Sequence, residues 1–138
     1  MYNPFVSIIV RTKNEDFWIG KCLNEIFNQK YKNFEVILVD NNSKDKTISI
    51  VKKNFLKVKI INYKSKIFLP GKALNLGIKK SKGSLVAMIS GHCIPKNENW
   101  LNNLVQNFKN SDVIACYGRQ EPSDISEPND VRDLTYLF

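Results

Sequence analysis

Short apolar blocks recur along the chain and are separated by longer stretches in which apolar residues return with a helical period. Each block is rich in valine and isoleucine, as expected for strands that are buried on both faces of a sheet. The blocks predict strands at residues 5–11, 34–39, 58–63, 84–89 and 113–117.

The stretches between the blocks predict amphipathic helices. One apolar stripe consists of Ile19, Cys22, Leu23, Ile26 and Phe27, and another of Trp100, Leu101, Leu104, Val105 and Phe108. Weaker patterns predict helices at 47–54, 72–81 and 131–138, and Asn14 is expected to cap the first helix, with Glu15 and Asp16 in its first turn. Strict alternation of strands and helices predicts an α/β fold: a three-layer α/β/α, mostly parallel, Rossmann-like sheet.

Length and composition suit one domain. The chain has 138 residues, of which 43% are hydrophobic and 25% charged, and it contains no apolar run long enough to cross a membrane. No secretory signal is recognisable at the start, so we expect a cytoplasmic protein, with the inner face of the membrane as an alternative. Three scattered cysteines favour neither a disulfide framework nor a zinc site, and the net charge of +8 suits anionic partners without choosing among them.

Polar clusters follow the predicted strands, at the edge where parallel sheets bind ligands. They lie at residues 11–15, 40–43, 69–72 and 90–93. No GxGxxG follows the first strand, and Gly71-Lys72 lacks the upstream glycine of a P-loop, so a dinucleotide dehydrogenase and a P-loop NTPase are both disfavoured.

Several of these motifs resemble those of family-two glycosyltransferases with the GT-A fold. The matching segments are VSIIV at 6–10 with Asn14-Glu15, EVILVDNNSKD at 35–45, GKALNLGI at 71–78 and KGS at 82–84. The segment at 35–45 is the most specific match, and the resemblance covers about residues 5–120. It implies a nucleotide-sugar-binding domain at 1–118, followed at 119–138 by a linker and the start of a missing acceptor-binding half that holds the catalytic base.

The resemblance and the strand-end positions together indicate which residues bind the nucleotide. In the family, the residues at the positions of Asp40 and Asn41 contact the base and ribose, and Lys72 and Arg119 are cations available to the diphosphate. The full expected set is Thr12, Asn14, Glu15, Asp40, Asn41, Lys72, Asn75, Ser90 and Arg119. Simpler roles stay open, because Asp40 also suits a turn, the residues from Thr12 to Glu15 suit a helix entry, and Lys72 and Arg119 suit solvent.

The chain departs from the family at its DxD motif, where Ser90 and His92 replace the two carboxylates. A serine can bind a ribose hydroxyl and a neutral imidazole can bind Mn²⁺, whereas Mg²⁺ prefers carboxylates. His92 is therefore the expected metal ligand, for Mn²⁺ or Mg²⁺, with a structural histidine as the alternative. The same Ser-x-His replacement, together with a run like GRQEP at 118–122, resembles a rhamnosyltransferase-like subgroup.

These features predict a donor domain that transfers a sugar from UDP or dTDP to a hydroxyl of a saccharide or lipid-linked acceptor. Such a domain would serve cell-surface polysaccharide or glycoconjugate synthesis, with peripheral membrane association as a further expectation. A non-catalytic nucleotide-binding module is the first alternative. A nucleic-acid-binding domain is a weaker one, because the lysines are spread over helices and loops rather than gathered on one face.

Overall fold

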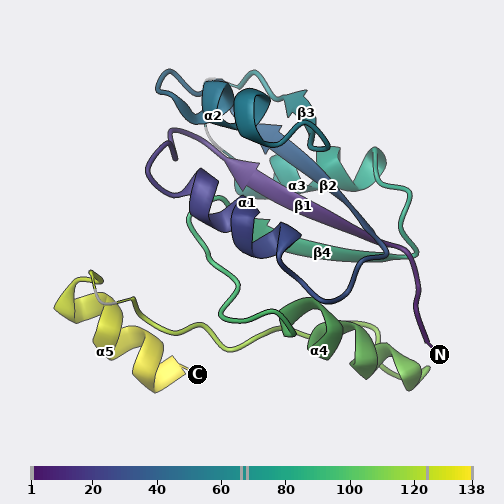
Figure 1. Ribbon diagram of the computed structural model, residues 1–138. Helices are drawn as coiled ribbons and strands as arrows, with labels where there is room; N and C mark the ends of the chain where they lie inside the picture. The colour runs from purple at the N-terminus through teal and green to yellow at the C-terminus, as the bar shows by residue number, and fades with distance from the viewer. Residues whose placement is uncertain (1, 66, 68, 124, 138) are drawn as a thin grey trace.

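The computed structural model describes residues 2–65, 67, 69–123 and 125–137 (Figure 1). Strands and helices alternate, as the apolar pattern predicts. In chain order the elements are β1 (Val6–Thr12), α1 (Ile19–Phe27), β2 (Phe34–Asp40), α2 (Thr47–Asn54), β3 (Lys59–Asn62), α3 (Pro70–Lys79), β4 (Leu85–Ser90), α4 (Trp100–Gln106) with a short 3₁₀ turn (Asn107–Lys109), and α5 (Pro128–Leu137).

The described strands form one parallel sheet in the order β3-β2-β1-β4. β1 lies between β2 and β4, and its last residues, Arg11 and Thr12, pair in register with Ser90 and Asp40. Three strands therefore end side by side at one edge of the sheet, which brings the polar residues that follow them together.

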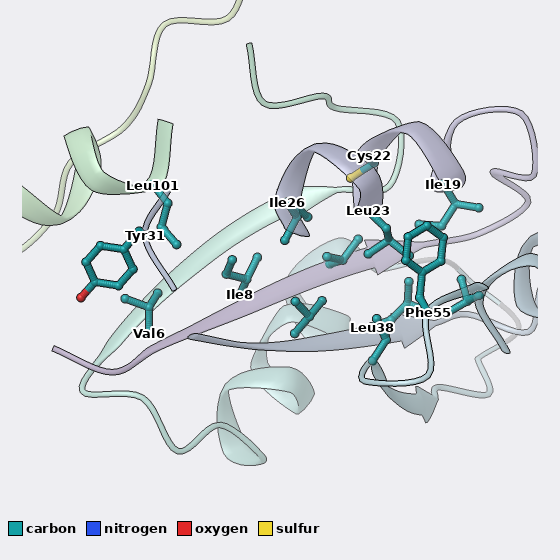
Figure 2. Packing of buried hydrophobic residues seen from close by; sticks show 14 of the residues in the cluster. Val6, Ile8, Ile19, Cys22, Leu23, Ile26, Tyr31, Leu38, Phe55 and Leu101 are labelled. Atoms are coloured by element: carbon teal, nitrogen blue, oxygen red, sulfur yellow. The ribbon is translucent and has the colours of Figure 1, made fainter. Parts of the chain in front are cut away.

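Helices cover both faces of the sheet, which confirms the three-layer α/β fold. On one face, α1, α2 and α4 enclose the larger core, in which Ile8, Leu23, Ile26 and Leu101 are fully buried (Figure 2). On the other face, α3 packs on β1 and β2 around a smaller cluster of Ile9, Ile37, Val39 and Ala73. The buried faces of α1, α4, β1 and β2 are those that the helical and strand periods predict, whereas β3 and β4, predicted to be buried on both faces, are partly exposed.

Close packing of α3 on the sheet depends on Gly77. A Cβ atom added there would lie 2.4 Å from Ile9 Cγ2 and 3.1 Å from Val39 Cγ2, so a side chain cannot be placed without displacing buried residues. At Gly71, in the first turn of the same helix, an added Cβ would meet nothing within 4 Å. Gly77 thus allows the helix to approach β1 closely, whereas Gly71 has no part in that packing.

β4 is an edge strand. One of its faces lies on the same side of the sheet as α3, but α3 does not cover it. Met88 pairs in register with Ile9, yet Met88 is 56% exposed and the nearby Val86 is 37% exposed. The other face of β4 packs against the larger core through Leu85, Ala87 and Ile89. This bare surface of β4 is defined here by Val86 and Met88.

Three details differ from the sequence-based expectations. The predicted strand at 113–117 is wrong: the segment passes α4 on its way to α5, and Ile114 is 93% exposed (Figure 1). An apolar run becomes a strand only where an edge pairs with it, and no described strand does. α3 and α5 begin at Pro70 and Pro128, slightly before the predicted starts, because proline suits a first helical turn.

The third difference concerns Asn14, which does not cap α1. The helix begins at Ile19 after a turn, and its N-cap residue is Trp18, which makes no side-chain capping bond. Within the described part of the chain, no helix is long and apolar enough to cross a membrane.

Candidate functional site

Polar residues gather at the carboxyl edge of the sheet around the end of β1. Thr12, Asp40, Asn41 and Ser90 are all buried there, with exposed fractions between 1% and 7%. The chain continues from β1 to β2 on one side and later returns to β4 on the other side, so the strand order reverses at β1. Open α/β sheets bind ligands at such a switch point.

Asn14 joins the loop after β1 to the loop after β2. Its backbone N–H donates to Ser43 Oγ (2.8 Å), and its Oδ1 accepts from the backbone N–H of Lys44 (2.8 Å). Its φ of 55° is in the left-handed region, which asparagine tolerates better than most residues. The structure therefore gives Asn14 a bracing role between two loops in place of the predicted helix cap.

Two further hydrogen bonds hold the same loops together. The backbone N–H of Glu15 donates to Thr47 Oγ1 (2.8 Å), and that of Asp16 donates to Asp45 Oδ2 (3.1 Å). Burial would raise the pKa of the Asp45 carboxyl, but the hydrogen bonds that it accepts from Thr47 and Asp16 outweigh burial and lower that pKa. With the two bonds of Asn14, these contacts form a cross-loop brace.

Asp40 ends β2 and turns its carboxylate toward the following loop. The backbone N–H and the hydroxyl of Ser43 both donate to this carboxylate, so Asp40 does shape a turn. A carboxylate has about four acceptor positions, and the two bonds from Ser43 leave it capacity for a further donor.

Two buried polar atoms beside Asp40 have no hydrogen-bond partner among the described residues: Thr12 Oγ1 and Asn41 Nδ2. Asn41 is otherwise fixed, because its backbone N–H donates to the Thr12 carbonyl (2.9 Å) and its Oδ1 accepts from the Ser65 N–H (3.3 Å). An unpaired buried polar atom costs about 1–3 kcal/mol. Two such atoms at the end of adjacent strands indicate a ligand that supplies their partners.

The loop after β4 brings His92 to Glu15. His92 Nδ1 lies 2.8 Å from Glu15 Oε1 and 3.4 Å from Ser90 Oγ. The His92 side chain is 48% exposed and that of Glu15 only 18%. The sequence predicts both residues at the site but not their contact, because no local pattern connects positions so far apart in the chain.

Two thiols lie at this loop: Cys22 of α1 is buried beneath it, and Cys93 within it is half-buried. Burial, with smaller contributions from Cys93 and Glu15, raises the pKa of Cys22 to about 12, and burial also raises the pKa of Cys93. Cys22 Sγ donates weakly to the Ser90 carbonyl at 3.8 Å. Both thiols are free and protonated at neutral pH, so their role here is packing.

Three predicted site residues are not joined to this group by hydrogen bonds or ion pairs among the described residues. Lys72 and Asn75 are exposed on α3, and Arg119 is exposed in the segment before α5. Within the described residues, no hydrogen bond or ion pair joins them to Asp40, Ser90 or His92. The segment of Arg119 is nevertheless tied to the loop after β4, because Lys96 forms an ion pair with Glu121 that lowers the pKa of Glu121.

Two surface hollows lie away from the candidate site. One, of about 500 Å³, is lined by Lys21, Asn24, Glu25, Ile94, Pro95 and Lys96 on the outer side of α1. Another, of about 720 Å³, lies near Tyr2 and Tyr31. Neither contains a candidate site residue. The feature that distinguishes the sheet edge is its pair of unpaired buried polar atoms.

The donor set at this edge suits a metal ion that takes most of its ligands from a substrate. In the described residues, no cluster of three or more His, Cys, Asp or Glu side chains could hold an ion. His92 would supply one nitrogen, and divalent cations at nucleotide sites take many of their ligands from phosphates and water. The residues present therefore fit an ion that arrives with a diphosphate.

Comparison with known proteins shows which family this chain is similar to. The model of the family described as glycosyl transferase family 2 matches residues 7–135. A Methanococcus voltae protein named dolichyl N-acetyl-alpha-D-glucosaminyl phosphate 3-beta-D-2,3-diacetamido-2,3-dideoxy-beta-D-glucuronosyltransferase is 37% identical over 108 residues, which are 72% of this chain and 33% of that protein.

Two solved structures are similar to this chain. Staphylococcus aureus TarS 1–349 in complex with UDP-GlcNAc is 29% identical with a TM-score of 0.69, over 76% of this chain and 31% of that one. The Pyrobaculum calidifontis mannosyltransferase PcManGT, at 24% identity and a TM-score of 0.77 over 97% of this chain and 39% of that one, supports the fold alone.

The chain spans about a third of the length of the relatives described above. The structural neighbours have the GT-A fold, which the sequence resemblance predicts. Since the family model covers nearly the whole chain, this protein belongs to glycosyltransferase family 2.

Proposed function

We propose that this chain binds the donor of a glycosyltransferase, a UDP- or dTDP-sugar, for transfer to a hydroxyl of a saccharide or lipid-linked acceptor. Residues 1–118 form the donor domain, and residues from 119 onward lead to the acceptor-binding half, which supplies the catalytic base. The product would be a cell-surface polysaccharide or glycoconjugate, made at the membrane surface when the acceptor is lipid-linked. The observation that carries the proposal is the pair of unpaired buried atoms beside Asp40.

The polar atoms at the ends of β1 and β2 complement a pyrimidine base. Uracil and thymine present an N–H between two carbonyl groups, so Asp40 would accept from the N–H and Asn41 Nδ2 would donate to a carbonyl. Guanine has its exocyclic amine where a pyrimidine has the second carbonyl, and this additional donor would cost about 1–3 kcal/mol if it were buried without an acceptor. UDP and dTDP both satisfy these atoms, and a rhamnosyl donor on dTDP is the finer form of the proposal.

The diphosphate would lie toward the loop after β4. Thr12 and Ser90 would bind ribose hydroxyls, Asn75 would face the donor from α3, and Lys72 and Arg119 would approach the phosphates. A bound Mn²⁺, held by His92, would neutralise charge on the nucleoside diphosphate as it leaves. The TarS relative, whose structure holds UDP-GlcNAc, supports this class of ligand.

Titration of UDP, dTDP and GDP, with and without Mn²⁺, tests the proposal through the melting temperature. UDP or dTDP should raise it, because a ligand at 100 times its Kd stabilises the folded state by about 2.7 kcal/mol. Asp40→Asn should reduce the shift, and Asp112→Asn, at an exposed site beyond α4, should not. A chain that no nucleotide stabilises would overturn donor binding, and an equal response to GDP would overturn the base assignment.

Transfer of the sugar to an acceptor, measured as an activity, distinguishes a transferase from a non-catalytic nucleotide-binding module. A nucleotide site should also persist at high salt, whereas nucleic-acid binding that depends on the charge of +8 should weaken steeply. Loss of UDP binding between about 50 and 500 mM salt, with nucleic acid bound at low salt, would favour the nucleic-acid alternative.

A further inference from the structure

The contact between Glu15 and His92 involves one particular nitrogen of the imidazole ring. Nδ1 lies 2.8 Å from Glu15 Oε1, a hydrogen-bond distance, and the described residues offer no hydrogen bond to Nε2. An ionised carboxylate only accepts hydrogen bonds, so Nδ1 must carry the proton. In the neutral ring, Nε2 is then left with its lone pair.

Glu15 is held in place independently of His92. Its backbone N–H donates to the buried hydroxyl of Thr47, and its carbonyl accepts from the backbone N–H groups of Trp18 and Ile19. Its side chain is only 18% exposed, which limits the rotamers open to it. The carboxylate is therefore a fixed acceptor to which the more exposed ring of His92 is oriented.

We infer that Glu15 is a positioning residue that selects the Nδ1–H tautomer of His92 and so presents Nε2 as a ligand atom. The inference rests on the proposed function and deepens it, because it assigns Glu15 to the imidazole and not to the nucleotide. Hydrogen bonding of the second ring nitrogen to a carboxylate is how proteins commonly orient a histidine and raise its basicity toward a metal ion.

This assignment has a consequence for how the site would hold a diphosphate. A neutral ring with its lone pair at Nε2 cannot donate to a phosphate oxygen, but it can bind a divalent cation that the diphosphate also binds. His92, oriented by Glu15, would thus perform the metal-binding role of the family's carboxylates. Binding of UDP or dTDP should then depend on Mn²⁺, and this dependence should need both residues.

The tautomer can be read directly, because His92 is the sole histidine in the sequence. Two-bond ¹⁵N–¹H spectra of the ligand-free protein at about pH 9, well above the usual histidine pKa, should show the proton on Nδ1. In Glu15→Ala the ring should change to a mixture of tautomers, and Glu15→Gln, whose amide donates as well as accepts, should restore Nδ1–H less completely than the carboxylate does. Glu98→Gln, at an exposed glutamate of the same loop that pairs with Lys30, is the matched control.

An Nε2–H tautomer in the unmodified protein, or no change in Glu15→Ala, would overturn the inference. This readout needs no nucleotide, so it stays separate from failure of the proposed function. A second readout is the Kd of UDP or dTDP with and without Mn²⁺. Glu15→Ala should weaken Mn²⁺-dependent binding about 10- to 100-fold and leave metal-free binding unchanged. Equal weakening in both conditions would mean that Glu15 touches the nucleotide itself.

Discussion

Two buried threonine hydroxyls show how differently the chain uses the same group. Thr47 is fully buried, and its Oγ1 accepts from the backbone N–H of Glu15. Thr12 is 1% exposed, and its Oγ1 has no partner among the described residues. The first hydroxyl stabilises the fold, whereas the second makes no hydrogen bond within it and is available to the nucleotide that we propose as the ligand.

Replacing each threonine by the isosteric valine should therefore have opposite effects. Thr47→Val should lower the free energy of unfolding by about 1–3 kcal/mol, because a buried N–H loses its acceptor. Thr12→Val should leave that free energy unchanged or raise it, since only an unpaired group is removed, and should weaken nucleotide binding. Urea unfolding of both variants measures the difference. Similar destabilisation by both substitutions would mean that Thr12 Oγ1 has a hydrogen-bond partner in solution.

Part of the candidate site follows from sequence alone, and part does not. Asp40 and Ser90 were predictable, because residues that follow parallel strands meet at one edge of the sheet. The brace through Asn14 and the pairing of Glu15 with His92 were not, because they depend on how separate loops fold over that edge. The motif suggested Asn14 as a helix cap, but the extra turn before α1 gives its amide to the neighbouring loop instead.

At the scale of elements, α3 is the helix whose position depends most on one residue. Gly77 brings its backbone against Ile9, which is fully buried in the central strand. Since Ile9 is β-branched and enclosed by Ile37 and Val39, it cannot easily move aside. Gly77, in the segment at 71–78 that resembles the family, thus has a packing role that requires no ligand.

Gly77→Ala should destabilise the protein by about 1–3 kcal/mol, the usual cost of overpacking, despite the better helix propensity of alanine. Gly71→Ala is the matched control, because an added Cβ there meets nothing within 4 Å, and it should be neutral or slightly stabilising. Thermal unfolding of the two variants compares them. A stable Gly77→Ala protein would show that α3 can shift away from β1.

The order of helices and strands along the chain was predictable from the sequence to a greater extent than the pairing of strands in the sheet. The four described strands and the helices between them lie where the apolar periods place them, because burial sets both periods. The segment at 113–117 has the same composition but remains exposed, with Tyr117 at 83%. The apolar composition of a segment indicates a preference for burial. Whether a strand edge is available to pair with that segment depends on the rest of the sheet.

At the scale of the whole molecule, the bare surface of β4 is an apolar strip on an edge strand. Exposed edges of this kind tend to pair with other chains. The net charge of +8 opposes such contact through repulsion between molecules, and salt screens that repulsion. Self-association of this 138-residue chain should therefore increase with ionic strength.

Met88→Lys should suppress that association, since it places a charge on the exposed face of the edge strand. Sedimentation at about 50 and 500 mM salt, roughly a threefold difference in screening length, measures the effect. Leu56→Lys is the control, because Leu56 is 88% exposed after α2 and lies away from β4. Equal suppression by both substitutions would mean that charge alone, and not the edge, governs association.

The cross-loop brace also bears on the thermodynamics of recognition. Four hydrogen bonds connect the loops after β1 and β2 in the free protein, so folding has already removed most of the conformational entropy of those loops. A ligand that docks on them has little ordering left to impose. Affinity at this part of the edge would then depend on how well the ligand matches a preorganised surface, and a poorly matched base could not be accommodated by loop rearrangement.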